Sequence, residues 1–118
     1  DNSNLVLRCE IDTAALAEKP KSEEVFNEGG FTWTVATKKV NEWSWMFNEH
    51  SCTSFCEFAL NCGVNHSGPW NCNAGVVVNM RRVDGTKLKI ANQRMEFCES
   101  RRFLNLGRVD WNNLMDPL

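Results

Sequence analysis

Residues 29–37 read Gly29-Gly30-Phe31-Thr32-Trp33-Thr34-Val35-Ala36-Thr37. The glycine pair indicates a turn, and the residues after it alternate so that Phe31, Trp33 and Val35 fall on one face. Aromatic and β-branched residues favour extended backbone because they pack well on a pleated surface. This stretch therefore predicts a strand with one buried face.

The same period of two recurs on both sides of this stretch. It runs through residues 4–11, 42–48, 52–62 and 70–80, and Asp84-Gly85 indicates a hairpin turn before a further run at 87–90. Residues 12–22 are expected to form a long connection with at most one helical turn before Pro20. Short strands with no long helical period predict an all-β fold, an antiparallel β-sandwich or barrel.

Length and charge narrow the class of protein. The 118 residues suffice for one domain with its own core, so residues 1–118 are expected to form a single domain, and the missing initial Met indicates a fragment of a larger protein. The formal net charge is −2, and the basic residues form no stripe that could follow a phosphate backbone. No apolar run approaches the roughly 20 residues of a membrane span. Neither nucleic acid nor a membrane is an expected partner.

Cysteines and histidines cluster in the middle of the chain and raise the question of a metal site. The cluster contains His50, Cys52, Cys56, Cys62, His66 and Cys72. On one extended strand Cys52 and Cys62 would lie about 33 Å apart at roughly 3.3 Å per residue, whereas zinc ligands converge on one ion. We predict reduced cysteines on core faces and no metal or cofactor; disulfides, together with the glycosylation sequon at 65–67, remain the alternative.

No catalytic motif is present, and a thiol paired with a histidine is the main enzymatic alternative. The chain is therefore predicted not to be an enzyme. Trp33, Trp43 and Trp45 share strand faces with other apolar residues and are expected in the core, against the alternative that they stack on sugar rings. Trp70 and Trp111 lie near predicted strand ends, where either location is open.

Four segments from Gly30 onwards form a distinctive series: Gly30 to Val35, Phe58-Ala59-Leu60-Asn61-Cys62, Trp70-Asn71-Cys72-Asn73-Ala74, and Val109 to Pro117. In order and spacing they resemble the MATH domain, the meprin and TRAF-C homology domain. The resemblance implies a TRAF-like antiparallel sandwich of seven or eight strands that binds short extended peptide segments of other proteins in a shallow groove and is not catalytic. Such a sandwich leaves an outer sheet face free to accept a strand-like ligand.

The groove residues that the resemblance implies carry over only in part. Counting from Leu60 places Glu57 on the outward face, and counting from Trp111 places Phe103 and Asn105 in the groove. Met95 falls where adaptor members often carry an aromatic residue, and Arg102 lies beside Phe103. The predicted peptide-binding residues are thus Glu57, Met95, Arg102, Phe103 and Asn105. This chain lacks some of the aromatic residues that the family has in its groove, which counts against the serine-rich ligand typical of the family.

The resemblance is closest to BTB-containing ubiquitin-ligase substrate adaptors, which implies a cytoplasmic or nuclear location. The family continues beyond the aspartate-proline pair into a last strand, whereas this chain ends at Leu118. An unpaired C-terminal sheet edge would favour homo-oligomers. The alternative reading is an extracellular β-sandwich, an adhesion or carbohydrate-binding module with disulfides.

Overall fold

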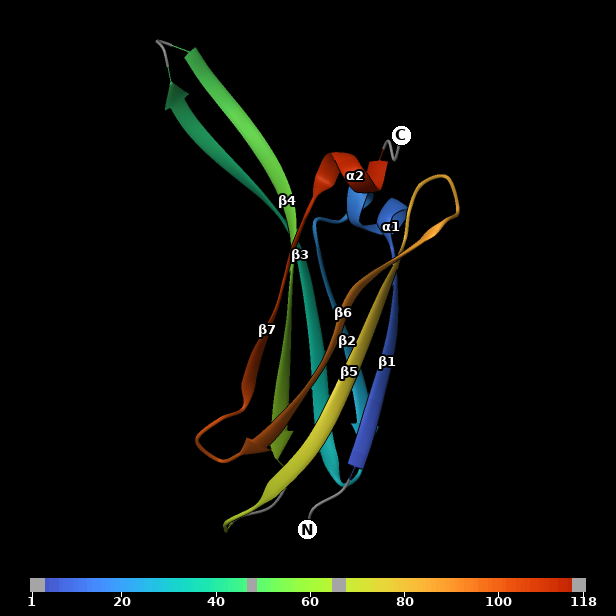
Figure 1. The fold of residues 1–118 in the computed structure, drawn as a ribbon, viewed down its shortest axis with the longest axis vertical. Coiled ribbons are helices and arrows are strands. Elements are labelled where there is room, and N and C mark those ends of the chain that lie inside the picture. The colour runs from blue at the N-terminus through green and yellow to red at the C-terminus, as the bar shows by residue number, and fades with distance from the viewer. Residues whose placement is uncertain (1–3, 47–48, 65–67, 116–118) are drawn as a thin grey trace.

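The computed structural model describes residues 4–46, 49–64 and 68–115 and forms a two-layered β-sandwich (Figure 1). One sheet, sheet A, has the strand order β1-β5-β6, and the other, sheet B, has the order β2-β3-β4-β7. The elements are β1 Asn4–Asp12, α1 Thr13–Glu18, β2 Lys21–Glu28, β3 Phe31–Met46, β4 Glu49–Val64, β5 Asn71–Arg81, β6 Lys87–Cys98, β7 Phe103–Asp110 and α2 Trp111–Met115. The all-β sandwich of seven strands confirms the predicted fold class, and all pairings within the described sheets except the parallel β1·β5 pair are antiparallel.

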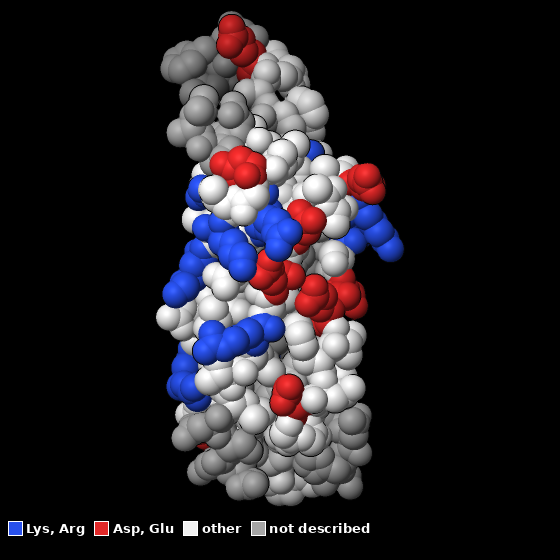
Figure 2. All heavy atoms as spheres, turned by 90° about the vertical axis from the view of Figure 1, so that its right-hand side faces the viewer, with Lys and Arg blue, Asp and Glu red and all other residues white. Residues whose placement is uncertain are grey.

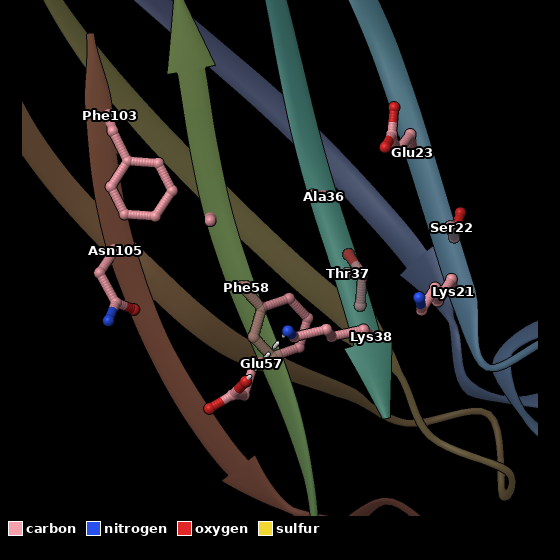
Figure 3. Close-up of a pocket in the computed structure, with 11 residues that line it drawn as sticks. Lys21, Ser22, Glu23, Ala36, Thr37, Lys38, Glu57, Phe58, Phe103 and Asn105 are labelled. Atoms are coloured by element: carbon pink, nitrogen blue, oxygen red, sulfur yellow. Dashed lines mark ion pairs between the residues drawn. The ribbon is translucent and has the colours of Figure 1, made fainter. Parts of the chain in front are cut away.

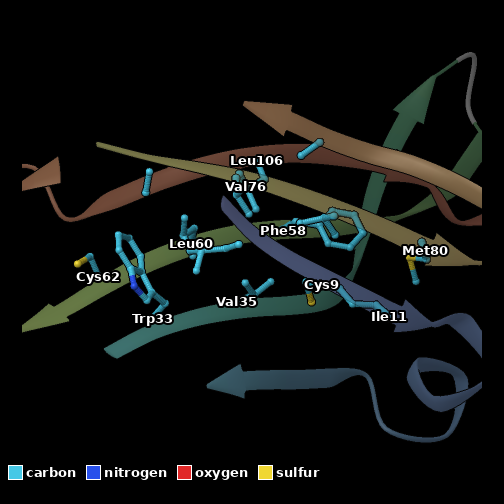
Figure 4. Close-up of a cluster of buried hydrophobic side chains, with 14 of the residues drawn as sticks. Cys9, Ile11, Trp33, Val35, Phe58, Leu60, Cys62, Val76, Met80 and Leu106 are labelled. Atoms are coloured by element: carbon cyan, nitrogen blue, oxygen red, sulfur yellow. The ribbon is translucent and has the colours of Figure 1, made fainter. Parts of the chain in front are cut away.

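The inner faces of the two sheets form the core that the alternating pattern predicts. Phe31, Trp33, Val35 and Thr37 are all buried on β3, and Figure 4 shows Trp33 and Val35 within the buried cluster. From sheet A the opposing side chains include Leu7, Cys9, Ile11, Val76, Val78 and Met80. The Trp33 ring meets the Phe97 ring edge to face at 5.1 Å, which ties the two sheets together through aromatic contact.

The segment between β1 and β3 has more structure than expected. Asp12 caps α1 by accepting a hydrogen bond from the backbone N–H of Ala14 at 3.1 Å, which confirms the short helical turn. The expected connection over residues 12–22 is confirmed only as far as Pro20, because β2 begins at Lys21 and every residue of β2 pairs with β3. The residues of β2 are mostly polar and show little apolar alternation, as is possible for an edge strand that pairs with one neighbouring strand and is largely exposed, so the sequence pattern did not reveal it.

The distal halves of β3 and β4 project beyond the sandwich as a two-stranded ribbon (Figure 1). Trp43 and Trp45 lie on this ribbon with exposed fractions of 71% and 60%, so their predicted burial is wrong. Trp43 and Trp45 lie on the same face of β3 as the core residues. The last residue of this face that another element covers is Lys39, whose Nζ lies 4.6 Å from the centre of the Trp111 ring on α2. An alternating pattern shows which residues share one face of a strand, but it does not show how far the opposite sheet extends along that face.

All six cysteines lie in the described residues and carry free thiols. Cys9, Cys56, Cys62 and Cys72 are buried as predicted, whereas Cys98 is half-buried. Cys52 is exposed, because it lies opposite Trp43 on the projecting ribbon. Within the described part of the chain, neither helix is long and apolar enough to cross a membrane.

Candidate functional site

A groove with a volume of about 390 Å³ crosses the outer face of sheet B (Figure 3). It receives side chains from all four strands of that sheet. The lining residues are Lys21, Ser22, Glu23, Ala36, Thr37, Lys38, Glu57, Phe58, Ala59, Phe103 and Asn105. The outward positions among them alternate with the core residues of the same strands, so the groove and the core use opposite faces of one sheet.

Two alanines form the floor of the groove. The register places Ala36 directly opposite Ala59, with Glu23 beside Ala36 on β2 and Asn105 beside Ala59 on β7. Cross-strand neighbours on one face lie about 5 Å apart, so two adjacent methyl side chains leave a depression between larger flanking residues. The row Glu23, Ala36, Ala59, Asn105 therefore runs from a charged wall, over a small apolar floor, to a polar wall.

The wall on β7 depends on an irregularity in that strand. The pairing with β4 shifts between Phe58 and Ala59. Gly107 lies at this point with a φ of 108°, a backbone conformation that residues with a Cβ rarely adopt. Asn105 Oδ1 accepts a hydrogen bond from the Gly107 N–H at 2.9 Å, which leaves the Asn105 amide NH₂ available to a ligand. Phe103 stands on the same outer face and is 61% exposed, an apolar surface without a cover.

An ion-pair network closes one end of the groove. Glu57 lies 2.8 Å from the Arg108 guanidinium and 3.9 Å from Lys38 Nζ, and Arg108 also contacts Glu42 at 3.2 Å. The hydrogen bonds that Arg108 donates to Glu42 and Glu57 raise its pKa above the ordinary value, which is already high enough to keep a guanidinium charged. Because two cations hold Glu57, its carboxylate would repel an anionic ligand less than an isolated glutamate would.

The structure brings together three of the five predicted binding residues. Glu57, Phe103 and Asn105 line the groove. Met95 lies opposite Ala74 in sheet A and packs against the core. Arg102 turns away: its guanidinium lies 5.8 Å from the centre of the Trp70 ring, and its Nε–H donates to the Glu99 carbonyl at 3.1 Å.

The sequence reasoning did not find the floor or the β2 wall of the groove. Ala36 and Ala59 each stand alone between bulkier residues, and their alignment depends on the pairing of strands more than twenty positions apart. The one available signal was that the nearest outward neighbours of both alanines are polar or charged, namely Thr34 and Lys38 on β3 and Glu57 and Asn61 on β4. Lys21 and Glu23 were hidden because their strand was not predicted.

The groove offers binding surface without an obvious reactive group. Its lining contains neither histidine nor cysteine. In the described ranges, no group of three or more His, Cys, Asp or Glu side chains lies close enough to hold a metal ion, and His66 falls outside those ranges. Comparisons of the chain with protein-family models, curated proteins and solved structures find no match.

Proposed function

We propose that the groove on sheet B binds a short extended peptide segment of another protein, and that the domain is a non-catalytic recognition module. The observation that carries this proposal is the pair Ala36 and Ala59, whose small side chains form the apolar floor of the groove between Phe103 and the charged residues of β2 and β3. β7 borders the groove and is an edge strand among the described strands of sheet B, so its outer edge offers backbone hydrogen bonds to an added strand.

The lining suggests what such a peptide should contain. An apolar side chain of moderate size would occupy the alanine floor and contact the exposed ring of Phe103. The amide of Asn105 would donate to a peptide carbonyl or a polar side chain. The end closed by Lys38 and Glu57 carries both signs of charge, which favours a polar residue there over a strongly acidic or basic one.

The resemblance to MATH domains supports the same role and extends it to a wider setting. In that setting the domain would select substrates for a BTB-containing ubiquitin-ligase adaptor in the cytoplasm or nucleus, and copies would associate into homo-oligomers. Three residues that the resemblance implies, Glu57, Phe103 and Asn105, lie together in one groove, which supports the peptide-binding part of the proposal.

Replacing Phe103 with alanine should weaken peptide binding by about tenfold, because an exposed aromatic anchor contributes on the order of 1–2 kcal/mol. Peptides are first enriched from a random-sequence display library on the wild-type domain, and affinities are then measured by fluorescence anisotropy. Ala59→Phe, which fills the floor, should weaken binding at least as much. Val83→Ala, which truncates another exposed apolar residue (51% against 61% for Phe103) in the β5–β6 turn, is the control. Equal affinity of Phe103→Ala and wild type for the enriched peptides would remove the groove assignment.

A second candidate function follows from Trp43 and Trp45, whose exposure fits stacking on sugar rings. Both indoles lie on one face of the projecting ribbon, although the His50 ring contacts the Trp45 ring edge to face at 4.3 Å. We expect any glycan-array signal to fall at least tenfold in a Trp43→Ala, Trp45→Ala double variant and to survive Phe103→Ala. Trp70, which is buried against Phe31 with ring centres 5.1 Å apart, is not available for stacking. Array signals that the double variant leaves unchanged would exclude this role for the ribbon.

A further inference from the structure

A second hollow lies on the outer face of sheet A, on the side of the sandwich opposite the groove. Its volume is about 460 Å³, and β1, β5 and β6 all contribute to it. Gly75 and Val77 of β5 form its floor, and Arg8, Lys89 and Arg94 surround them from the two flanking strands. Three cations thus meet over a floor that carries no charge.

The Arg94 side chain is held in a defined position across the floor. Its Nη1 donates to Asn73 Oδ1 at 2.6 Å, and its Nη2 lies 3.5 Å from the Leu5 carbonyl oxygen on β1. To reach that carbonyl from β6, the guanidinium crosses β5 at Gly75, where a Cβ would lie only 3.0 Å from Nη2. The glycine therefore makes room for the arginine, and the ligand-facing cation is fixed before a ligand arrives.

These cations lack the acidic partners that similar residues have nearby. At the α1 end of the same face, Glu10 lies 3.0 Å from Arg81 and 3.2 Å from Lys87, so each of those two cations has an acidic partner. Among the described residues, no carboxylate forms an ion pair with Arg8, Lys89 or Arg94. In Figure 2 most Lys and Arg side chains lie on the left half of the view, with a further group at its right edge, whereas most acidic side chains lie at the centre and right.

Unbalanced positive charges gathered on one sheet face repel one another, and an anionic ligand would relieve that repulsion. Guanidinium groups pair with carboxylate and phosphoryl oxygens through two parallel hydrogen bonds. Arg8 and Lys89 project from the two strands that flank β5, about 10 Å apart, which is more than one small anion can bridge but suits two acidic side chains of an extended peptide. We propose that this hollow binds an extended acidic peptide segment through carboxylate or phosphoryl groups, independently of the groove on sheet B.

Three features favour a peptide over a longer polyanion. The hollow offers only three cations, fewer than the six to ten phosphate contacts of a typical DNA-binding surface. Glu96 extends the same face beyond Arg94, opposite Asn73, and would repel a chain of phosphates continuing in that direction. The chain as a whole carries a net charge of −2.

The test uses the 118-residue chain and a short fluorescein-labelled peptide of alternating glutamate and serine, with anisotropy as the readout. We expect this peptide to bind, its glutamine counterpart not to bind, and affinity to fall as salt rises from about 50 mM to about 200 mM. A double variant, Arg8→Glu with Lys89→Glu, should weaken binding at least about tenfold. The matched control, Lys19→Glu with Arg101→Glu, changes the net charge equally at exposed sites elsewhere and should bind as wild type does.

Gly75→Ala separates a built site from general attraction, because it keeps every charge and displaces Arg94 alone. We expect it to weaken binding about threefold or more, with the circular dichroism spectrum unchanged. A phosphoserine version of the peptide shows which anion is preferred; tighter binding of either form supports the site. Equal loss in the Lys19, Arg101 control, binding of the glutamine peptide, or binding of a single-stranded RNA in place of both acidic peptides would overturn the proposal.

Discussion

Replacing Trp33 with alanine should lower the free energy of unfolding by about 4 kcal/mol, within the range for truncating a buried aromatic residue. Trp33 is fully buried, and its ring contacts those of Phe97 at 5.1 Å and Phe31 at 5.9 Å. Its Nε1–H donates to the Glu28 carbonyl at 3.1 Å, so the variant also leaves that acceptor without its partner. A small domain has only about 5–15 kcal/mol of stability, so urea unfolding followed by circular dichroism should show a large shift.

Trp43→Ala is the matched control, because it makes the same chemical change on the same strand. Trp43 is 71% exposed, and its loss should change the free energy of unfolding by no more than about 0.5 kcal/mol. The contrast between the two variants tests whether the core ends near Lys39. A loss at Trp43 comparable to that at Trp33 would show that another surface of the protein covers the ribbon.

The two tryptophans also show what can be predicted from local pattern. Trp33 and Trp43 belong to the same alternating face of β3, and the period of two placed both correctly on that face. Burial depends in addition on the opposite layer, whose strands β5 and β6 end at the turn after Arg81 and before Lys87. The residues of β3 and β4 do not reveal where the strands of the opposite sheet end, so the projecting ribbon could not be predicted from its own residues.

The candidate site, like the fold, was predictable only in part. The resemblance to MATH domains, counted along the chain from Leu60 and Trp111, implies Glu57, Phe103 and Asn105, and these three residues do line one groove. Ala36 and Ala59 were not found, because a floor arises from the register between strands and not from any residue's chemistry. Met95 and Arg102 were placed by position alone; contacts with the core and with Trp70 decide where these side chains lie.

The cysteines should differ in alkylation rate by about a thousandfold in the folded protein. Burial is the main cause that raises the pKa of Cys9, Cys56 and Cys62 to about 12, and the Cys9 thiol also lies 3.3 Å from the Glu24 carboxylate. Near pH 8 this pKa lowers the reactive thiolate fraction about a thousandfold relative to a thiol with the ordinary value of 9.0. Hydrogen bonds from Ser100 lower the pKa of Cys98, so Cys98 should react early with iodoacetamide, followed by peptide mass spectrometry.

Urea provides the control, since the unfolded chain should expose all six cysteines to reaction at similar rates. A pair that stays unmodified in urea until a reductant is added would be a disulfide, and would support the extracellular alternative. Rapid alkylation of Cys56 in the folded protein would contradict the burial of that thiol. Cys52 lies exposed on the ribbon and is a second internal standard for access without burial.

The same burial gives stability a definite dependence on pH. The thiolate is the charged form, and the folded pKa of about 12 lies above the ordinary value of 9.0, so the unfolded chain loses its thiol protons first as pH rises. The stabilising contribution is therefore complete below about pH 9 and is lost progressively toward pH 12. Cys56→Ala removes one such group, so the stability difference between wild type and this variant should shift against wild type over that window. A difference that stays constant from pH 8 to pH 11, measured by urea unfolding, would mean that the Cys56 thiol ionises as readily in the folded protein as in the unfolded chain.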